Sequence, residues 1–310
     1  MAVGAVCEGV EVGIIEENGK VAAYFPFQRS VRSIGIPAGG ILSDYQGLIC
    51  RPLFEFNPSE LVKGCHLSAW DFDHLLGSQT CFMPFHQHHG KSPLIDLSEG
   101  YEAYVEERRA TGSEQIKKCR NMVRRIEREL GSLRFVSHSE DADLLQQVLS
   151  WKSQQYVVSS KHDLCSFEWV RSIIRRIHAT QTKEFAGVLS ALYAGDRLLA
   201  GHFGMRSRTV WHYWFPAYSA EYAKYSPGLI LLLKMAEHAE QFGLRTIDLG
   251  GGLSLYKERL MNASIPLASG SVAVPSWLSL RRGMRLKLRA IAKGTPGAKK
   301  AWEVVTSFRG

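Results

Sequence analysis

The sequence lacks any apolar stretch long enough to cross a membrane. Its longest run of large aliphatic residues, Leu229 to Leu233, is ended by Lys234, whereas a membrane-spanning helix needs about 20 apolar residues. The first ten residues contain Cys7 and Glu8 where a secretory signal requires an apolar core. We therefore expect a cytoplasmic protein.

Several reactive motifs are also missing. The six cysteines form no C-x-x-C pair and no regular framework, so we expect reduced, mostly structural thiols. There is no G-x-S-x-G elbow, and no cysteine stands in a context that lowers its pKa, so a serine or cysteine nucleophile is not supported. The histidines of residues 86–89 have no patterned cysteine or carboxylate partner, so no metal is expected.

Net positive charge is absent from the body of the chain and concentrated at its end. Residues 1–280 hold 29 basic and 29 acidic residues, whereas residues 281–310 hold nine basic residues and one acidic residue, which gives the net charge of +8. The basic residues of Glu114 to Leu130 are interleaved with glutamates, which favours a solvated helix face over a nucleic-acid surface.

The tail, residues 276–310, therefore carries the basic character. Within it, residues 277–292 place apolar side chains such as Leu278 and Leu288 among five basic residues. Such an amphipathic segment can lie on an anionic membrane surface. A disordered, solubilising tail and a helix packed on the body are the alternatives.

The remaining 275 residues alternate between strand-like and helix-like patterns, and the length of 310 residues favours two domains. Alternating apolar residues around Asn18-Gly19 predict a hairpin, and residues 80–97 suggest short strands. The patterns predict helices over 114–130, 141–156 and 167–177, strands over 133–136, 185–193, 197–206, 209–215, 245–249 and 265–274, and an α/β class with a mixed sheet.

Residues 225–230, YSPGLI, begin the helix around which the second half is organised. Ser226 is a favourable N-cap, Pro227 suits the first helical position, and Gly228 lets a ligand approach the backbone. Free N–H groups and the helix dipole favour an anion at this terminus. The helix is expected to run to about Phe242. A short strand, three glycines (250–252) and a helical turn with Tyr256 and Lys257 follow.

These stretches together resemble the GNAT-fold acyltransferases of the CelD-like and FemAB-like group. The resemblance rests on residues 225–228, 243–250 and 256–257, with further matches at residues 25–27, 43–47, 118–131, 151–156, 200–204 and 211–218. It covers about residues 10–275 and implies two tandem GNAT-like mixed-sheet halves with flanking helices, at residues 1–138 (acceptor side) and 139–275 (acyltransferase half). The phosphate-binding loop is shorter here than in the family, with Lys224 its only adjacent cation.

The resemblance implies that the second half binds the acyl donor, acetyl-CoA or another acyl-CoA. Ser226, Gly228 and Leu229 would hold the donor at the helix terminus, and Lys257 would bind an anionic group unless it is a surface lysine. Asp44 and Tyr45 would line the acceptor side.

Acyl transfer also needs a base, an acid and a surface for the acceptor. Asp248 is a candidate base or, equally, a buried carboxylate fixed by hydrogen bonds. Tyr256 is a candidate acid because its hydroxyl stays protonated at neutral pH, or else a core tyrosine. Aromatic faces pack against sugar C–H surfaces, so Trp211 and Tyr218, with His212 and Trp214 beside them, are candidates for acceptor binding, although aromatic residues in strands are more often core.

The sequence thus predicts a bacterial GNAT-like N- or O-acyltransferase. Its acceptor would be the amino or hydroxyl group of a sugar, or of a lipid-linked sugar, in envelope or exopolysaccharide biosynthesis, because CelD-like proteins are linked to bacterial cellulose and other extracellular polysaccharides. Two alternatives stay open: a FemAB-like transferase that takes an aminoacyl group from tRNA, and a non-catalytic GNAT-like scaffold.

Overall fold

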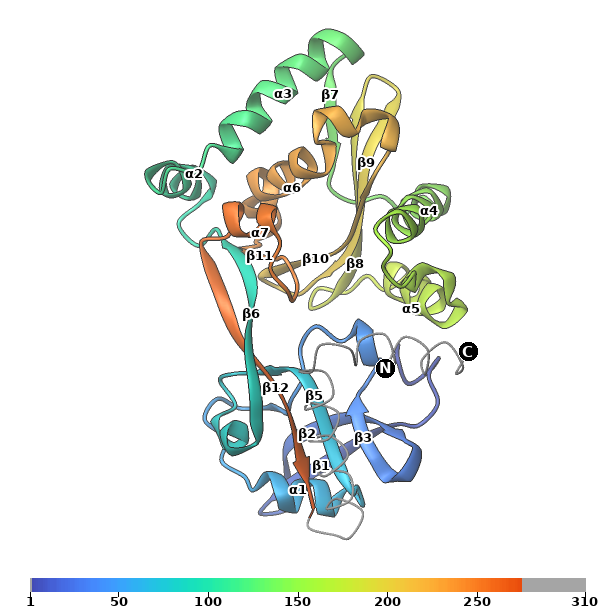
Figure 1. The fold of residues 1–310 in the computed structure, drawn as a ribbon, viewed down its shortest axis with the longest axis vertical. Helices are drawn as coiled ribbons and strands as arrows, with labels where there is room; N and C mark the ends of the chain where they lie inside the picture. The colour runs from blue at the N-terminus through green and yellow to red at the C-terminus, as the bar shows by residue number, and fades with distance from the viewer. Residues whose placement is uncertain (1, 275–310) are drawn as a thin grey trace, which may run out of the picture. The chain divides into compact units, whose positions relative to one another are not determined.

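The computed structural model describes residues 2–274, which form two compact units (Figure 1). Unit 1 comprises residues 2–8, 76–78 and 89–268, and unit 2 comprises residues 9–75, 79–88 and 269–274. The predicted limit at residue 138 falls inside unit 1, so residues 89–138 share a unit with most of the predicted acyltransferase half. The predicted tail segment, residues 276–310, lies outside the described residues.

Unit 2 begins with the predicted hairpin. Strands β1 (Val10–Glu17) and β2 (Lys20–Ser30) pair antiparallel around Asn18 and Gly19, both of which have positive φ, as a tight two-residue turn requires. Strands β3 (Ile34–Pro37) and β4 (Ile49–Cys50) both pair with β2, and β5 (Ala69–Leu76) runs parallel to β3. Helix α1 (Pro58–Gly64) starts at Asn57, whose side chain accepts hydrogen bonds from the first-turn N–H groups.

The expectation of short strands over residues 80–97 was wrong in its first part. Thr80–Phe85 is a 3₁₀ helix, and a single long strand, β6 (His86–Asp96), follows it. Phe82 explains the difference, because its fully buried ring packs against Trp70 and Phe72, and tertiary packing overrides the local preference.

Unit 1 contains the predicted helices and strands within a few residues. Its helices are α2 (Tyr101–Ala110), α3 (Gln115–Leu130), α4 (Ala142–Val158), α5 (Glu168–His178), α6 (Pro227–His238) and α7 (Leu255–Leu260). Its strands are β7 (Leu133–Val136), β8 (Ala186–Ala194), β9 (Arg197–Arg206), β10 (Val210–Tyr218), β11 (Thr246–Asp248) and the first part of β12 (Ala263–Ala273).

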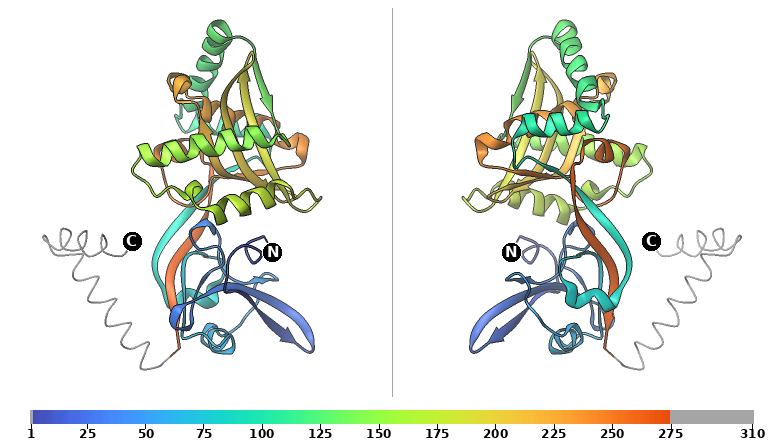
Figure 2. Two further views of the ribbon diagram at one scale, coloured as in Figure 1. Left: turned by 90° about the vertical axis from the view of Figure 1, so that its right-hand side faces the viewer. Right: turned by 90° about the vertical axis from the view of Figure 1, so that its left-hand side faces the viewer.

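The sheet of unit 1 is mixed and has helices on both faces. Its strands follow the order β6-β11-β10-β9-β8-β7, with β10 and β11 parallel and the other neighbours in this order antiparallel. Helices α4 and α5 cover one face, and α6 covers the other with α3 packed on it (Figures 1 and 2). The predicted α/β class with a mixed sheet is confirmed.

Helix α6 connects the two parallel strands and is shorter than predicted. It ends at His238, and a 3₁₀ turn (Ala239–Phe242) leads to Gly243, which has φ +70 and ends the helical segment as expected. Ser226 does not act as an N-cap through its side chain. Its backbone is left-handed (φ 53, ψ 48), and its carbonyl accepts the N–H groups of Leu229 and Ile230 instead.

Candidate functional site

The site forms where the two parallel strands separate. Strands β10 and β11 pair as far as His212 and Asp248; β11 then ends, while β10 continues to Tyr218. Ligands of open α/β sheets bind beyond the carboxyl ends of such strands. Helix α6 starts shortly after the end of β10, so its N-terminus faces the same region.

A cavity of about 670 Å³ occupies this place in unit 1. Its walls come from the second half of β10, the segment before α6, the start of α6, the glycine turn after β11, helix α7 and the far half of α4. The lining side chains include three lysines but no aspartate or glutamate, so the wall is cationic: Lys152, Gln155, Tyr156, Lys161, Tyr213, Trp214, Pro216, Tyr218, Ala223, Ser226, Gly228, Leu229, Leu249, Gly251, Gly252, Leu253, Ser254, Tyr256 and Lys257.

Six of the ten predicted site residues meet in this cavity: Ser226, Gly228, Leu229, Tyr218, Tyr256 and Lys257. Gly228 is close to Tyr218, since a Cβ at Gly228 would lie 3.4 Å from the Tyr218 ring. The Gly228 carbonyl accepts a hydrogen bond from the buried Tyr213 hydroxyl, at 3.1 Å, which fixes the start of α6 against β10. The structure therefore brings these six residues together, and their assignment to a functional site stays a prediction.

The other four predicted residues lie elsewhere. Asp248 is 4% exposed, and Trp211 is 1% exposed within the core beside Phe242; neither lines the cavity. Asp44 and Tyr45 belong to unit 2, in the segment before β4. Trp214, three residues beyond Trp211, is the tryptophan that lines the cavity.

Asp248 is fixed by groups from three segments. Its Oδ1 accepts hydrogen bonds from the Ser92 hydroxyl at 3.1 Å and the Gly250 N–H at 2.9 Å, and its Oδ2 lies 3.2 Å from His212 Nδ1. A carboxylate held in this way suits the second of the two predicted roles, a structural anchor for the end of β11.

Lys257 is engaged with the backbone. Its ammonium donates to the carbonyls of Gly250, Gly251 and Gly252 at 3.0, 3.1 and 3.3 Å. Gly250 and Gly252 have φ of +73 and +79, a conformation that favours glycine. Lys257 thus stabilises the turn that carries one wall of the cavity and adds positive charge to that wall.

Tyr256 lies beside this turn, on the first residues of α7. Burial raises the pKa of its hydroxyl above the ordinary value, and a hydrogen bond with Ser254 opposes this in part. The hydroxyl therefore stays protonated throughout the neutral range, as a general acid must.

His202 shapes the wall from behind. This fully buried imidazole accepts a hydrogen bond from the Trp214 N–H at 3.2 Å and stacks on Tyr213. The bond lies at the irregularity in β10 between His212 and Phe215, so it holds the strand where it turns Trp214 to the cavity. Burial, with the nearby His212, lowers the pKa of His202 to about 3, which keeps it neutral.

Sequence reasoning missed the role of Lys152 and Gln155 on α4. The Lys152 ammonium donates to the Pro216 carbonyl at 3.2 Å, and burial lowers the pKa of this lysine to about 8. The Gln155 Nε2 is buried and has no hydrogen-bond acceptor within residues 2–274. The signal was available, because Lys152 continues the buried stripe of Leu145, Val148 and Leu149 at helical spacing.

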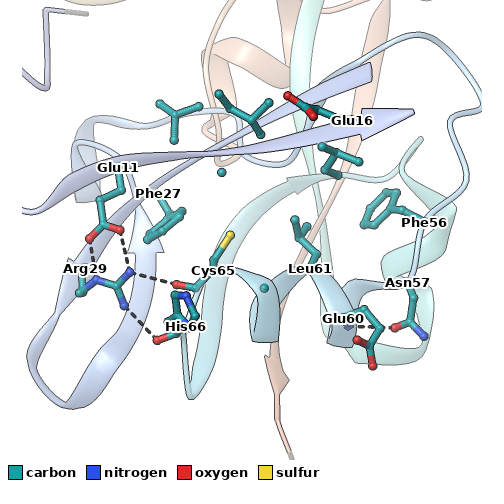
Figure 3. Close-up of a pocket in the computed structure, with 15 residues that line it drawn as sticks. Glu11, Glu16, Phe27, Arg29, Phe56, Asn57, Glu60, Leu61, Cys65 and His66 are labelled. Carbon is teal, nitrogen blue, oxygen red and sulfur yellow. Dashed lines mark hydrogen bonds and ion pairs between the residues drawn. The ribbon is translucent and has the colours of Figure 1, made fainter. Parts of the chain in front are cut away.

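Unit 2 has a cavity of about 610 Å³ between β1 and α1 (Figure 3). Glu11 and Arg29 form a two-point ion pair at one end of it, at 2.5 and 2.6 Å, and Arg29 also donates to the carbonyls of Cys65 and His66. Its charged groups at this end therefore satisfy one another, and no predicted site residue lines it.

Residues 2–274 offer neither a metal cluster nor a membrane span. No group of three or more histidine, cysteine or acidic side chains in this part of the chain is placed to hold a metal ion. None of the helices described is long and apolar enough to span a bilayer.

Comparison with known proteins identifies the domain that contains the cavity of unit 1. Residues 113–258 match the sequence family described as "Acetyltransferase (GNAT) domain". Residues 113–258 form a GNAT-type acyltransferase domain. All the residues that line the cavity, from Lys152 to Lys257, lie within this match. None of the curated proteins compared matches the chain significantly.

Solved structures with the same fold extend beyond that domain. FemX has 10% identity and a TM-score of 0.57, and the match covers 88% of this chain and 90% of FemX. The C-terminal domain of a putative lysylphosphatidylglycerol synthetase from Agrobacterium fabrum has 14% identity and a TM-score of 0.54 over 90% of this chain and 89% of its own. A protein of unknown function from Bacteroides thetaiotaomicron has 8% identity and a TM-score of 0.54, and the match covers 87% of this chain and 88% of that protein. At these identities the likeness concerns the fold.

Proposed function

We propose that the GNAT domain transfers an acyl group from acyl-CoA, with acetyl-CoA the first donor to test. The observation that carries the proposal is the cationic cavity at the start of α6, which has three lysines and no acidic side chain in its wall. A phosphorylated donor is favoured there by charge and by the helix terminus.

The donor's phosphates would lie at the terminus of α6. Within the first turn, the N–H groups of Leu229 and Ile230 are taken by the Ser226 carbonyl, and Pro227 has none, so the Gly228 N–H is the group offered to a ligand. Because Gly228 has no side chain, a phosphate can approach this N–H closely. Lys161 and Lys257 supply further positive charge in the cavity wall.

Transfer requires a proton for the leaving group. When the acceptor's nitrogen or oxygen attacks the thioester carbonyl, the carbon–sulfur bond breaks and the thiolate leaves. Tyr256 would donate this proton, because it lines the cavity and its raised pKa keeps the hydroxyl protonated.

The acceptor would be an amino or hydroxyl group of a sugar or lipid-linked sugar in envelope or exopolysaccharide biosynthesis. Trp214 and Tyr218 support this class, because both line the cavity and Tyr218 is 39% exposed, so an aromatic face is available for stacking. Trp211 does not serve this purpose, since it is buried. Asp44 and Tyr45, in unit 2, remain the predicted acceptor-side residues.

The second candidate donor is an aminoacyl-tRNA. The fold is shared with FemX and with the lysylphosphatidylglycerol synthetase domain, and FemAB-like proteins use aminoacyl-tRNA. The same cationic cavity would accept the terminal phosphates of a charged tRNA. The basic residues 281–310 would add sequence-independent attraction for RNA.

Isothermal titration calorimetry of the full chain separates these donors. We expect acetyl-CoA or a longer acyl-CoA to bind with a 1:1 stoichiometry, and charged tRNA to bind no better than uncharged tRNA. Preference for charged tRNA, with no heat from any acyl-CoA, would select the aminoacyl alternative. If none of these donors binds, the non-catalytic GNAT-like scaffold would be the remaining interpretation.

A further inference from the structure

The amine of Lys152 occupies an unusual position in the cavity wall. It projects from the middle of α4, on the stripe that packs against the sheet, and reaches the Pro216 carbonyl of β10 at 3.2 Å. No acidic side chain among residues 2–274 forms an ion pair with it, and none is among the causes of its pKa shift. The amine therefore donates one hydrogen bond to a carbonyl, and it also lines the cavity.

The groups around this amine are mostly basic or neutral. Lys161 follows the end of α4, Lys257 lies on α7, and the neutral His202 stands behind on β9. Tyr156 lies one turn further along α4, with the amine 5.1 Å from its ring centre. Cys165 on the 3₁₀ turn Leu164–Ser166 has a pKa raised to about 11, so its thiol is neutral. The Pro216 carbonyl, the Tyr156 ring and Cys165 favour the charged form of the amine. Burial, with the nearby Lys161 and Lys257, outweighs them and lowers the pKa of Lys152.

The cavity offers few other groups that can accept a proton. Its wall, within the described residues, contains no carboxylate, and Asp248 is fixed outside it by Ser92, Gly250 and His212. The Lys257 amine donates to three carbonyls. Tyr256 and Tyr213 have raised pKa values and remain protonated.

We propose that Lys152 is the general base of this site and removes the proton from the acceptor's attacking nitrogen or oxygen. The inference rests on the proposed acyl transfer. As the new bond forms between the acceptor atom and the acyl carbon, the acceptor's proton passes to the neutral Lys152 amine. The carbon–sulfur bond then breaks, and Tyr256 protonates the thiolate. Solvent afterwards takes the proton from Lys152 and returns one to Tyr256, so that the cycle balances.

The physical requirement for this role is met near neutral pH. Desolvation in the cavity wall, with the repulsion of Lys161 and Lys257, lowers the pKa of Lys152 to about 8. A useful fraction of the amine is therefore neutral at about pH 7 to 8, which is the condition for an efficient base. If Lys152 were instead a fixed cation that binds an anionic substrate group, its charge rather than its neutral form would matter.

The first test measures Lys152 without reference to any activity. The full chain is labelled briefly with acetic anhydride over a pH range from about 6 to 11, which brackets the ordinary lysine value, and modification at each lysine is followed by mass spectrometry. We expect Lys152 to titrate with its lowered pKa of about 8. The exposed Lys118 of α3 is the internal reference. Titration of Lys152 together with Lys118 would overturn the proposal.

The second test uses acetyl-CoA with glucosamine as a probe acceptor and follows thiol release. The guanidinium of Lys152→Arg stays protonated and cannot accept a proton. We therefore expect turnover to fall by about 10²–10⁴-fold, with the affinity for acetyl-CoA close to that of wild type. Lys152→Ala should lose as much and recover in part with added ethylamine, whereas Lys118→Gln should match wild type.

The outcomes separate the two proposals. If wild type binds no acyl-CoA, the proposed function fails, and the role of Lys152 with it. If wild type binds and turns over acetyl-CoA, but Lys152→Arg is as active as wild type, Lys152 acts through its charge and the general-base role is overturned. Loss of acetyl-CoA affinity in Lys152→Ala without rescue by ethylamine would contradict the proposal in the same way.

Discussion

The Nδ1 atom of His212 lies 3.2 Å from the Oδ2 atom of Asp248, at the last paired position of β10 and β11. The two strands separate beyond this pair, and the cavity opens there. Asp248 also accepts hydrogen bonds from Ser92 and Gly250, so a single carboxylate ties together β6, β11 and the glycine turn. The pair thus holds the ends of the two strands together beside the cavity, which neither residue lines.

Asp248→Asn tests whether this carboxylate is structural or catalytic. Asparagine keeps an oxygen for Ser92 and Gly250 but removes the acceptor facing His212. We expect a loss of about 1–3 kcal/mol in the free energy of unfolding, the cost of a buried group left without its partner, and only a small change in turnover by the folded protein. Urea unfolding and thiol release provide both values. A loss of turnover of about 10²-fold at unchanged stability would instead establish Asp248 as the base.

His202 makes stability depend on pH. Its folded pKa of about 3 lies below the ordinary value of about 6.5, so the unfolded chain binds an extra proton between these values. The free energy of unfolding is unaffected by this group above about pH 6.5. It falls by about 1.4 kcal/mol per pH unit as the pH decreases from there toward 3. In urea titrations, the free energy of unfolding should therefore decrease by about 2 kcal/mol less between about pH 7 and pH 5 in His202→Gln than in wild type.

The matched control for this variant is His88→Gln, at an exposed position of β6. It should follow the wild-type pH dependence. If His202→Gln also follows it, the imidazole is not held neutral by burial.

Tyr256→Phe tests the acid. Removal of the hydroxyl should lower kcat by about 10²–10⁴-fold and leave the donor Kd nearly unchanged, because general acid catalysis acts in the transition state. Because burial raises the pKa of Tyr256, the acid should stay protonated throughout the neutral range. Turnover close to that of wild type, measured by thiol release at saturating acetyl-CoA, would reject the role.

Local signals in the sequence were enough to predict most of unit 1 and the hairpin of unit 2. The turn at Asn18-Gly19, the stop at Gly243 and the periodic stripe of α3 each depend on a few neighbouring residues, and each prediction was confirmed. Where tertiary packing determines the local conformation, the strand prediction was wrong: residues 80–85 form a 3₁₀ helix around the buried Phe82 ring.

Local signals also explain why some of the predicted site residues lie together in the structure. Gly228 and Tyr256 follow recognisable turn and helix signals, and the structure brings them to one cavity. The burial of Trp211 and the exposure of Trp214 to the cavity depend on an irregularity in β10 and on the His202 hydrogen bond. Neither has a local sequence signal. Helical spacing signalled the burial of Lys152, but the lysines that help to lower its pKa lie outside its helix, so the sequence did not predict the shift.

The membrane prediction concerns residues 275–310, outside the described part of the chain. If their basic amphipathic segment binds anionic lipid, about 1 kcal/mol is available per basic residue near the surface. The full chain should then sediment with phosphatidylglycerol-rich vesicles at low salt and be released at high salt. Truncation after Pro275 should abolish sedimentation. Equal sedimentation of the truncated chain would exclude the tail as the anchor.

Donor placement at the start of α6 is the central claim, and Gly228→Val tests it most directly. A Cβ here meets the Tyr218 ring at 3.4 Å, an ordinary contact, so the fold should tolerate the change while the added methyl groups block approach to the Gly228 N–H. Gly90→Val, at an open position in β6, is the matched control. Calorimetry with acyl-CoA should show at least a tenfold weaker Kd for Gly228→Val, about 1.4 kcal/mol, and the wild-type Kd for Gly90→Val. A folded Gly228→Val protein with the wild-type Kd would contradict the account.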